Sequence, residues 1–190
     1  ASPRAPAWRE LGLGAELRWI DDPEAHVDGA RPDRPLRVAA DRNALIDRAI
    51  ARAKEQRRLV LWFVPRISEG QNRGRQMYRA PILEGYVMQL LFEDPDLVAL
   101  AESRFVCARV NLDETLAARF DLRPLDFVEP ALVFLDGEGK LVHFVERIRS
   151  FDAHWFVELM RRVLAHAHLD GGDETVTDPQ SKRTYDKYDR

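Results

Sequence analysis

The residue type best suited to chemistry in this chain is cysteine, and Cys107 is the only cysteine among the 190 residues. A single cysteine excludes an intrachain disulfide, a two-cysteine redox motif and a cysteine-rich zinc site. Cys107 stands between Val106 and Ala108 in an apolar run, where a free cysteine usually behaves as a small buried hydrophobe. A reactive thiol needs a helix N-terminus or cationic, exposed surroundings. We therefore expect Cys107 to be inert, with a residual thiol-disulfide role as the alternative.

Two histidines near the carboxyl end of a predicted helix are the second candidate, as metal ligands. His166 and His168 are two residues apart, so on a helix they point about 200° away from each other around the axis. They can bind one ion only if the helix has already ended, with Asp170 and Asp173 as further ligands. Interaction with the helix dipole and with solvent is the interpretation that we favour. The histidines therefore give no prediction of a metal, and no other cofactor is expected.

A basic loop over residues 65–80 is the third candidate. It is rich in Gly, Asn, Ser and Arg, and its arginines are Arg66, Arg73, Arg75 and Arg79. A predicted helix begins directly after the loop, and backbone N–H groups at a helix start favour anions. An anion, a phosphate or an acidic segment is therefore a candidate ligand. A solvated basic loop is the simpler interpretation of the same charges.

Helices and strands alternate in the segments that must position these residues. Helical spacing of apolar residues predicts helices over 42–57, 82–92, 95–103, 111–120 and from Ser150 or Asp152 to a point before Gly171. Asp41 and Asp94 are the predicted N-caps of the first and third of these helices. Apolar runs predict strands over 59–64, 105–110, 131–135 and 141–145, and the sequence DGEG at 136–139 predicts a hairpin between the last two. Parallel strands joined by helical crossovers and followed by an antiparallel pair form an α/β sandwich.

Several segments resemble exported thioredoxin-like domains, and they occur in the same order over residues 41–169. These segments are LVLWFV at 59–64, FEDPDL at 92–97, FVCARVN at 105–111 and PALVFLDGEGK at 130–140. The resemblance implies a thioredoxin-like α/β sandwich with a mixed central sheet. It also implies an N-terminal extension at 1–40, an insertion at 65–80 and a polar C-terminal tail at 170–190.

The resemblance also locates the place where this family carries its active site. It puts the family's cis-proline at Pro130, with Glu129 before it, and the two cysteine positions at Pro81 and Glu84. Neither of these two residues can form a thiolate, which dithiol exchange requires. The family function that remains is binding of an extended segment in a groove formed by all four residues. As a less favoured alternative, Glu84 and Glu129 share a proton, bind a cation or act as acid and base.

Composition and charge restrict the partners of the chain. The net charge of −3 and the pI near 6.0 provide no general basic surface, so nucleic acid is not expected as a partner. No apolar run approaches the roughly 20 residues that span a bilayer, so the chain itself is not expected to insert into a membrane. Trp8 and Trp19 in the extension are costly to leave in water. We therefore expect a redox-inactive accessory module that binds a protein partner or belongs to a larger assembly, rather than an enzyme.

The first residues give an expectation about location. The chain opens on Ala1-Ser2-Pro3 and a lead rich in proline and arginine, which fits trimming after a signal or anchor segment. We therefore expect export to the periplasm or another extracytoplasmic space. A cytoplasmic location is the alternative.

Overall fold

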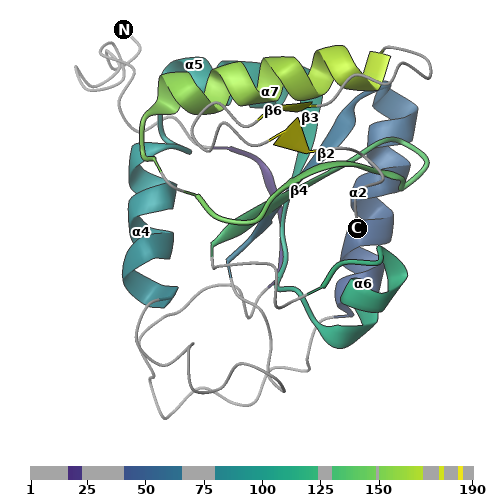
Figure 1. The fold of residues 1–190 in the computed structure, drawn as a ribbon. Coiled ribbons are helices and arrows are strands. Elements are labelled where there is room, and N and C mark those ends of the chain that lie inside the picture. Colours follow the sequence, from purple (N-terminus) through teal and green to yellow (C-terminus); the bar gives the residue numbers. More distant parts are fainter. Residues whose placement is uncertain are drawn as a thin grey trace, which may run out of the picture.

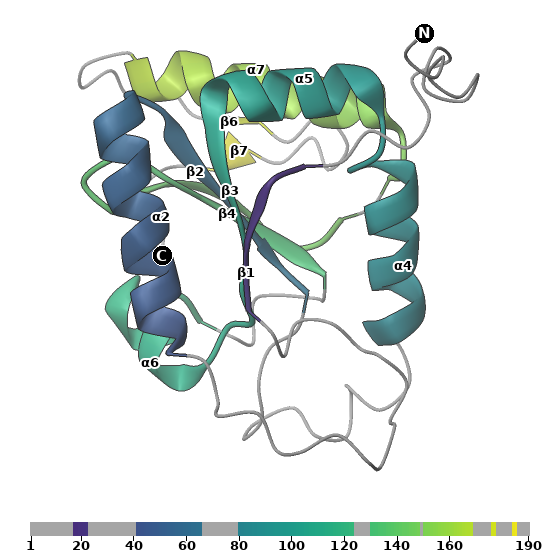
Figure 2. The same cartoon turned by 180° about the vertical axis from the view of Figure 1, so that it is seen from behind.

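A five-stranded sheet between two helical layers forms the centre of the molecule (Figures 1 and 2). The computed structural model describes residues 17–22, 41–65, 80–123, 130–148, 150–168, 176–177 and 184–185. The strands are β1 (Trp19–Asp21), β2 (Leu59–Val64), β3 (Phe105–Arg109), β4 (Ala131–Leu135) and β5 (Leu141–Val145), in the order β1-β3-β2-β4-β5. Strands β1, β3 and β2 are parallel, whereas β4 and β5 each run antiparallel to the preceding neighbour. The predicted fold class, a thioredoxin-like α/β sandwich with a mixed central sheet, is confirmed.

The helices cover both faces of this sheet. Helices α2 (Arg42–Gln56) and α6 (Glu114–Arg119) cover one face, and α4 (Ala80–Leu90), α5 (Pro95–Arg104) and α7 (Ala153–His168) cover the other (Figures 1 and 2). Two predicted N-caps are confirmed, because Asp41 Oδ1 accepts from Ala44 N at 3.1 Å and Asp94 Oδ1 accepts from Leu97 N at 3.0 Å. No helix within the described residues is long and apolar enough to cross a membrane.

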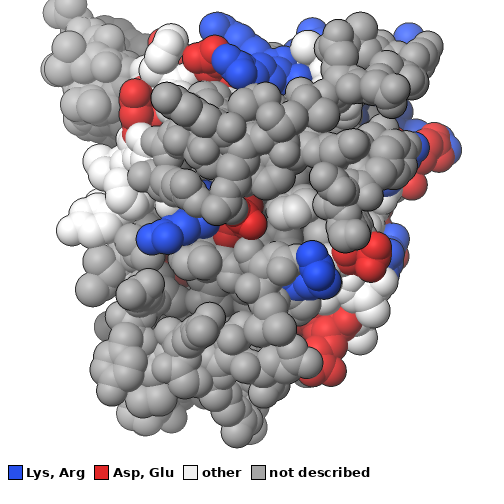
Figure 3. Space-filling view, viewed as in Figure 1, with Lys and Arg blue, Asp and Glu red and all other residues white. Residues whose placement is uncertain are grey.

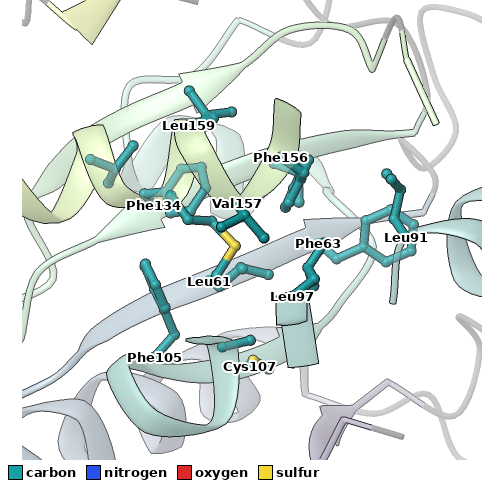
Figure 4. Close-up of a cluster of buried hydrophobic side chains, with 14 of the residues drawn as sticks. Leu61, Phe63, Leu91, Leu97, Phe105, Cys107, Phe134, Phe156, Val157 and Leu159 are labelled. Carbon is teal, nitrogen blue, oxygen red and sulfur yellow. The ribbon is translucent and has the colours of Figure 1, made fainter. Parts of the chain in front are cut away.

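Strand β2 shows why an uninterrupted apolar run suits the middle of such a sheet. Leu59, Leu61 and Phe63 belong to the hydrophobic cluster under α4, α5 and α7, part of which is drawn in Figure 4. The alternate residues, Val60, Trp62 and Val64, belong to the cluster under α2 and α6. Successive side chains of a strand point to opposite faces, so a strand covered on both sides needs apolar residues throughout.

The hairpin between β4 and β5 forms where the sequence predicts it. Asp136 N donates to Lys140 O at 2.9 Å, and Asp136 Oδ1 accepts from the backbone N–H groups of Glu138 and Lys140. Gly139 has a φ of 79°, in the left-handed region that glycine adopts without strain. The turn therefore depends on its aspartate and its second glycine.

Strand β1 is the main difference from the sequence analysis, which assigned residues 1–40 to an extension. Trp19 pairs with Cys107 and Ile20 with Ala108, so this segment is an edge strand of the sheet. Leu17 and Ile20 are buried in opposite hydrophobic clusters. A strand of three residues has no readable periodicity, which is why the sequence did not reveal it. The folded unit thus includes residues that precede the predicted boundary at Asp41.

The predicted polar tail also contains regular structure. Strands β6 (Val176–Thr177) and β7 (Thr184–Tyr185) pair antiparallel in a separate two-stranded sheet. Two-residue strands are too short for an alternating pattern to identify them in the sequence.

Candidate functional site

The carboxyl ends of β1, β3 and β2 meet at one edge of the sheet, and Pro130, one of the four residues predicted to form the groove, lies at this same edge. Val64 pairs with Ala131, so continuing the register by one residue places Pro65 opposite Pro130. Both prolines are buried. Proline has no backbone N–H, so the ladder between β2 and β4 ends here. Glu129, the residue before Pro130, lies outside the described residues.

The two positions that resemble the family's cysteine sites both belong to α4. Pro81 occupies the first turn of the helix, where its missing N–H breaks no helical hydrogen bond. Its side chain lies outside the described residues. Glu84 is described and is only 8% exposed. A partner bound at this edge could therefore contact only the small exposed part of the Glu84 side chain.

The remaining predicted ligand groups are not brought together within the described residues. Arg66, Arg73, Arg75 and Arg79 all lie outside the described residues. His166 is half-buried on α7, and the side chain of His168 is not described. Within the described part of the chain, no group of three or more His, Cys, Asp or Glu residues could hold a metal ion.

A buried ion pair that the sequence analysis did not identify lies on the α2 side of this edge. Asp22 follows β1 and is fully buried, and its Oδ2 lies 2.8 Å from Nε of Arg42 in the first turn of α2. Backbone bonds hold it in place, because Asp22 N donates to Arg109 O at 2.9 Å and Asn111 N donates to Asp22 Oδ2 at 3.5 Å. The pair therefore connects the end of the edge strand to α2.

A second ion pair lies on the opposite, α4 side of the same edge. Asp21 accepts two bonds from Arg109, at 2.7 Å from Nε and 2.9 Å from Nη2. The guanidinium carbon of Arg109 also lies 5.7 Å from the centre of the Trp19 ring, and Nη1 donates to Met88 Sδ of α4 at 3.7 Å. Two parallel bonds to one carboxylate fix both groups in orientation. Arg109 thus fixes α4 and β1 to the end of β3.

Asp113 completes this set of charges at the start of α6. Burial alone would raise the pKa of Asp113, but hydrogen bonds from Leu116 N and Thr115 Oγ1 and the nearby Arg42 guanidinium together hold the pKa below its usual value. The carboxylate is therefore charged at neutral pH and is already occupied as a helix cap. Together, these pairings join three carboxylates and two guanidinium groups at this edge, with a formal net charge of −1.

Cys107 is buried within the sheet, and it is among the residues that line a cavity of about 270 Å³ together with Arg18 and Arg58. It is 3% exposed, pairs with Leu61 of β2 and Trp19 of β1, and lies in the cluster shown in Figure 4. Burial, with a smaller contribution from the negative charge of Glu102, raises the pKa of this thiol far above its ordinary value. The thiolate is the nucleophilic form, so this burial disfavours the form of Cys107 that could react.

We expect Cys107 in the folded chain to react with Ellman's reagent roughly 100-fold more slowly than in urea, because the reagent must wait for the sheet to open. In urea the assay should give one thiol per chain. Raising the pH from about 7 to about 9 should accelerate the reaction strongly in urea, where the thiol has its ordinary pKa of about 8.5, and little in the folded state. A folded-state rate within about tenfold of the unfolded one would show that the thiol is accessible.

Two solved structures are similar to this chain at low identity. One is the crystal structure of disulphide isomerase from Xylella fastidiosa Temecula1, with 14% identity, a TM-score of 0.45, and coverage of 70% of this chain and 98% of that one. The other is a DsbH oxidoreductase, with 12% identity, a TM-score of 0.45, and coverage of 87% and 95%. No protein-family model matches the chain, and a search of curated proteins finds no match. The fold assignment rests on the strand order and directions described above.

The sequence does contain a signal for the ion pair between Arg109 and Asp21. Arg109 stands in a run that is otherwise apolar, FVCARV, and an arginine in a buried strand needs an acidic partner. The sequence does not show which acid it is, because Asp21 is 88 residues away in a segment expected to be an extension. The pairing becomes evident only once β1 is placed beside β3.

Proposed function

We propose that this chain is a non-catalytic thioredoxin-fold module that binds a protein partner or belongs to a larger assembly, and that it does not carry out dithiol exchange. The burial of Cys107 carries the proposal, because the only thiol of the chain lies within the sheet, away from any helix start. Dithiol exchange needs an accessible thiolate and a second cysteine, and this chain provides neither.

The partner site that we propose is the edge with Pro81, Glu84, Glu129 and Pro130. The described part of this edge supports the idea because side-chain and backbone contacts connect it to β1, β2 and α4. Arg109 connects the edge strand to α4, and the two buried prolines close the ladder between β2 and β4. A surface that is already ordered loses little conformational entropy when a partner binds. Export to the periplasm or another extracytoplasmic space is part of the same proposal.

An insulin-reduction assay tests the claim that the chain does not carry out dithiol exchange. We expect the chain to show the same turnover as its Cys107→Ser variant, equal to the background of the reductant alone. Turnover that disappears in Cys107→Ser would identify a thiol enzyme and would contradict the proposal.

Native mass spectrometry of the full chain, isolated from the cells that make it, tests the claim that the chain binds a protein partner. We expect a stoichiometric complex with another protein. Gly85→Arg should weaken it, because a Cβ at Gly85 meets no atom within 4 Å, so α4 can carry a bulky cation at the residue after Glu84. Ala51→Arg, on an exposed position of α2, is the matched control and should leave the complex intact. An uncomplexed chain, or equal loss in both variants, would contradict the proposed site.

Metal analysis separates this proposal from the alternative of a metal-binding protein or enzyme that uses Glu84 with Glu129, or His166 with His168. Stoichiometric metal in the purified chain that is lost in Glu84→Gln or His168→Ala would contradict the proposed binding module and would identify the chain as a metalloprotein. The proposed function predicts metal well below one equivalent in all three proteins.

A further inference from the structure

An open groove runs between α5 and α7 beside the carboxyl end of α4. Its volume is about 810 Å³. It is lined by residues from the start of α5, the start of α7 and the end of α4, among them Leu90, Leu100, Phe151 and Val157. The groove is distinct from the proposed partner site, because it is lined by Leu90, the last residue of α4, whereas Pro81 lies in the first turn of that helix. Figure 1 shows α5 and α7 above one end of α4.

The apolar surface continues beyond the groove. Within the described residues, the exposed large apolar side chains are Tyr86 at 49%, Leu90 at 50% and Phe151 at 36%. Leu90 and Phe151 line the groove, and the ring of Tyr86 lies 5.8 Å from that of Phe151. Figure 3 shows uncharged side chains gathered along the edge of the molecule where α4 lies. Single exposed apolar residues are normal on a monomer, whereas a cluster of all three indicates a contact surface.

The charges in the groove are unbalanced. Asp94, Asp96 and Asp152 line it, whereas Arg161 is the only arginine or lysine among its described lining residues. Asp94 and Asp152 accept backbone N–H groups at the starts of α5 and α7, which fixes their carboxylates at the groove wall. A bound segment that carries positive charge would therefore be attracted to a groove in which three carboxylates stand beside apolar side chains.

We infer that this groove, together with Tyr86, binds a segment of a partner protein that carries apolar side chains and several lysines or arginines. The inference rests on the proposed function in that the partner is a protein, but it assigns a second, separate contact surface. A small molecule confined to the groove would leave the exposed ring of Tyr86 uncovered, because Tyr86 is not among the lining residues. An amphipathic helix can cover the groove and Tyr86 together, because its apolar residues form a stripe along one side.

A pair of designed peptides tests the inference directly. Both are amphipathic helices of about 14 residues with leucine at helical spacing, and they differ only in having lysine or glutamate at the polar positions. By fluorescence anisotropy we expect the lysine peptide to bind about tenfold more tightly than the glutamate peptide at low salt, and the difference to shrink as salt is added. Amide and methyl NMR shifts should locate the lysine peptide on Leu90, Leu100, Phe151 and Val157.

Substitutions identify the surface. The double variant Leu90→Ala with Phe151→Ala should weaken the lysine peptide about tenfold or more, and both sites are exposed enough for the fold to tolerate the change. Asp96→Lys should also weaken binding. Glu114→Lys, an exposed acid in the first turn of α6, is the matched control and should leave binding unchanged. Gly85→Arg, which is designed to block the proposed partner site, should also leave peptide binding unchanged, so the two proposals can fail separately.

Several outcomes would overturn the inference. Equal affinity for the two peptides, or NMR shifts elsewhere on the chain, would show that the groove does not select a basic apolar segment. A dimer that dissociates in the Leu90→Ala, Phe151→Ala variant would make a second copy of the chain the occupant. Tighter peptide binding after deletion of residues 1–16 would assign the groove to the chain's own N-terminal segment.

Discussion

Replacing Asp22 by alanine is expected to lower the free energy of unfolding by about 3 kcal/mol, because it removes the closer and fully buried carboxylate from Arg42, which keeps only the contact with Asp113 at 3.5 Å. Asp22 is fully buried, and the Arg42 side chain is 16% exposed, so little water can replace the lost carboxylate. The substitution also removes the acceptor of Asn111 N. Asp22→Asn keeps the size of the side chain and an acceptor oxygen, so we expect a smaller loss.

Urea unfolding followed by tryptophan fluorescence measures this effect. Asp47→Ala is the matched control, because it removes an acid from an exposed pair with Arg119, and such pairs contribute about 1 kcal/mol or less. The double variant Asp22→Ala with Arg42→Ala should lose less than the sum of the two single variants, because it leaves neither charge unpaired. Additive losses would show that the two side chains do not depend on each other.

The sequence predicted those parts of the fold whose signals are local. The run LVLWFV could be recognised as a doubly covered strand because every residue of a central strand must be apolar. Asp41 and Asp94 could be recognised as helix caps because the capping bonds reach only a few residues along the chain. The hairpin at 136–139 is equally local.

The features that the sequence left open depend on residues far apart. Asp22 lies 20 residues from Arg42 in sequence, and β1 is too short to be recognised before β3 is placed beside it. The groove likewise requires Leu90, Leu100 and Phe151 from three separate segments, and it exists only because α5 and α7 lie side by side over one face of the sheet. Hydrophobic periodicity shows which face of an element is buried, but it does not show which elements are neighbours.

A chain that begins at Asp41, the boundary predicted from sequence, is expected to lose about 5 kcal/mol or more of folding free energy. Removing β1 deletes the buried side chains of Leu17 and Ile20 and the partly buried ring of Trp19, and burying a large apolar side chain contributes about 1.5–3 kcal/mol. It also leaves Arg109, at 7% exposure, without the acceptor of the two hydrogen bonds that it donates to Asp21. A loss of this size is comparable to the total stability of many domains, about 5–15 kcal/mol.

A chain that begins at Leu17 is the informative control, because it keeps every described contact of β1. We expect it to match the full chain in its urea midpoint, whereas the chain from Asp41 should unfold at much lower urea or aggregate through the exposed edge of β3. Equal midpoints for all three chains would show that β1 contributes no stability, and would restore the boundary read from the sequence. The outcome also bears on function, because Asp21 holds Arg109 in place and Arg109 contacts Met88 of α4, the helix that carries both Glu84 and Leu90. Loss of the strand should therefore weaken binding at both proposed surfaces together, whereas Gly85→Arg and the Leu90→Ala, Phe151→Ala variant each affect only one.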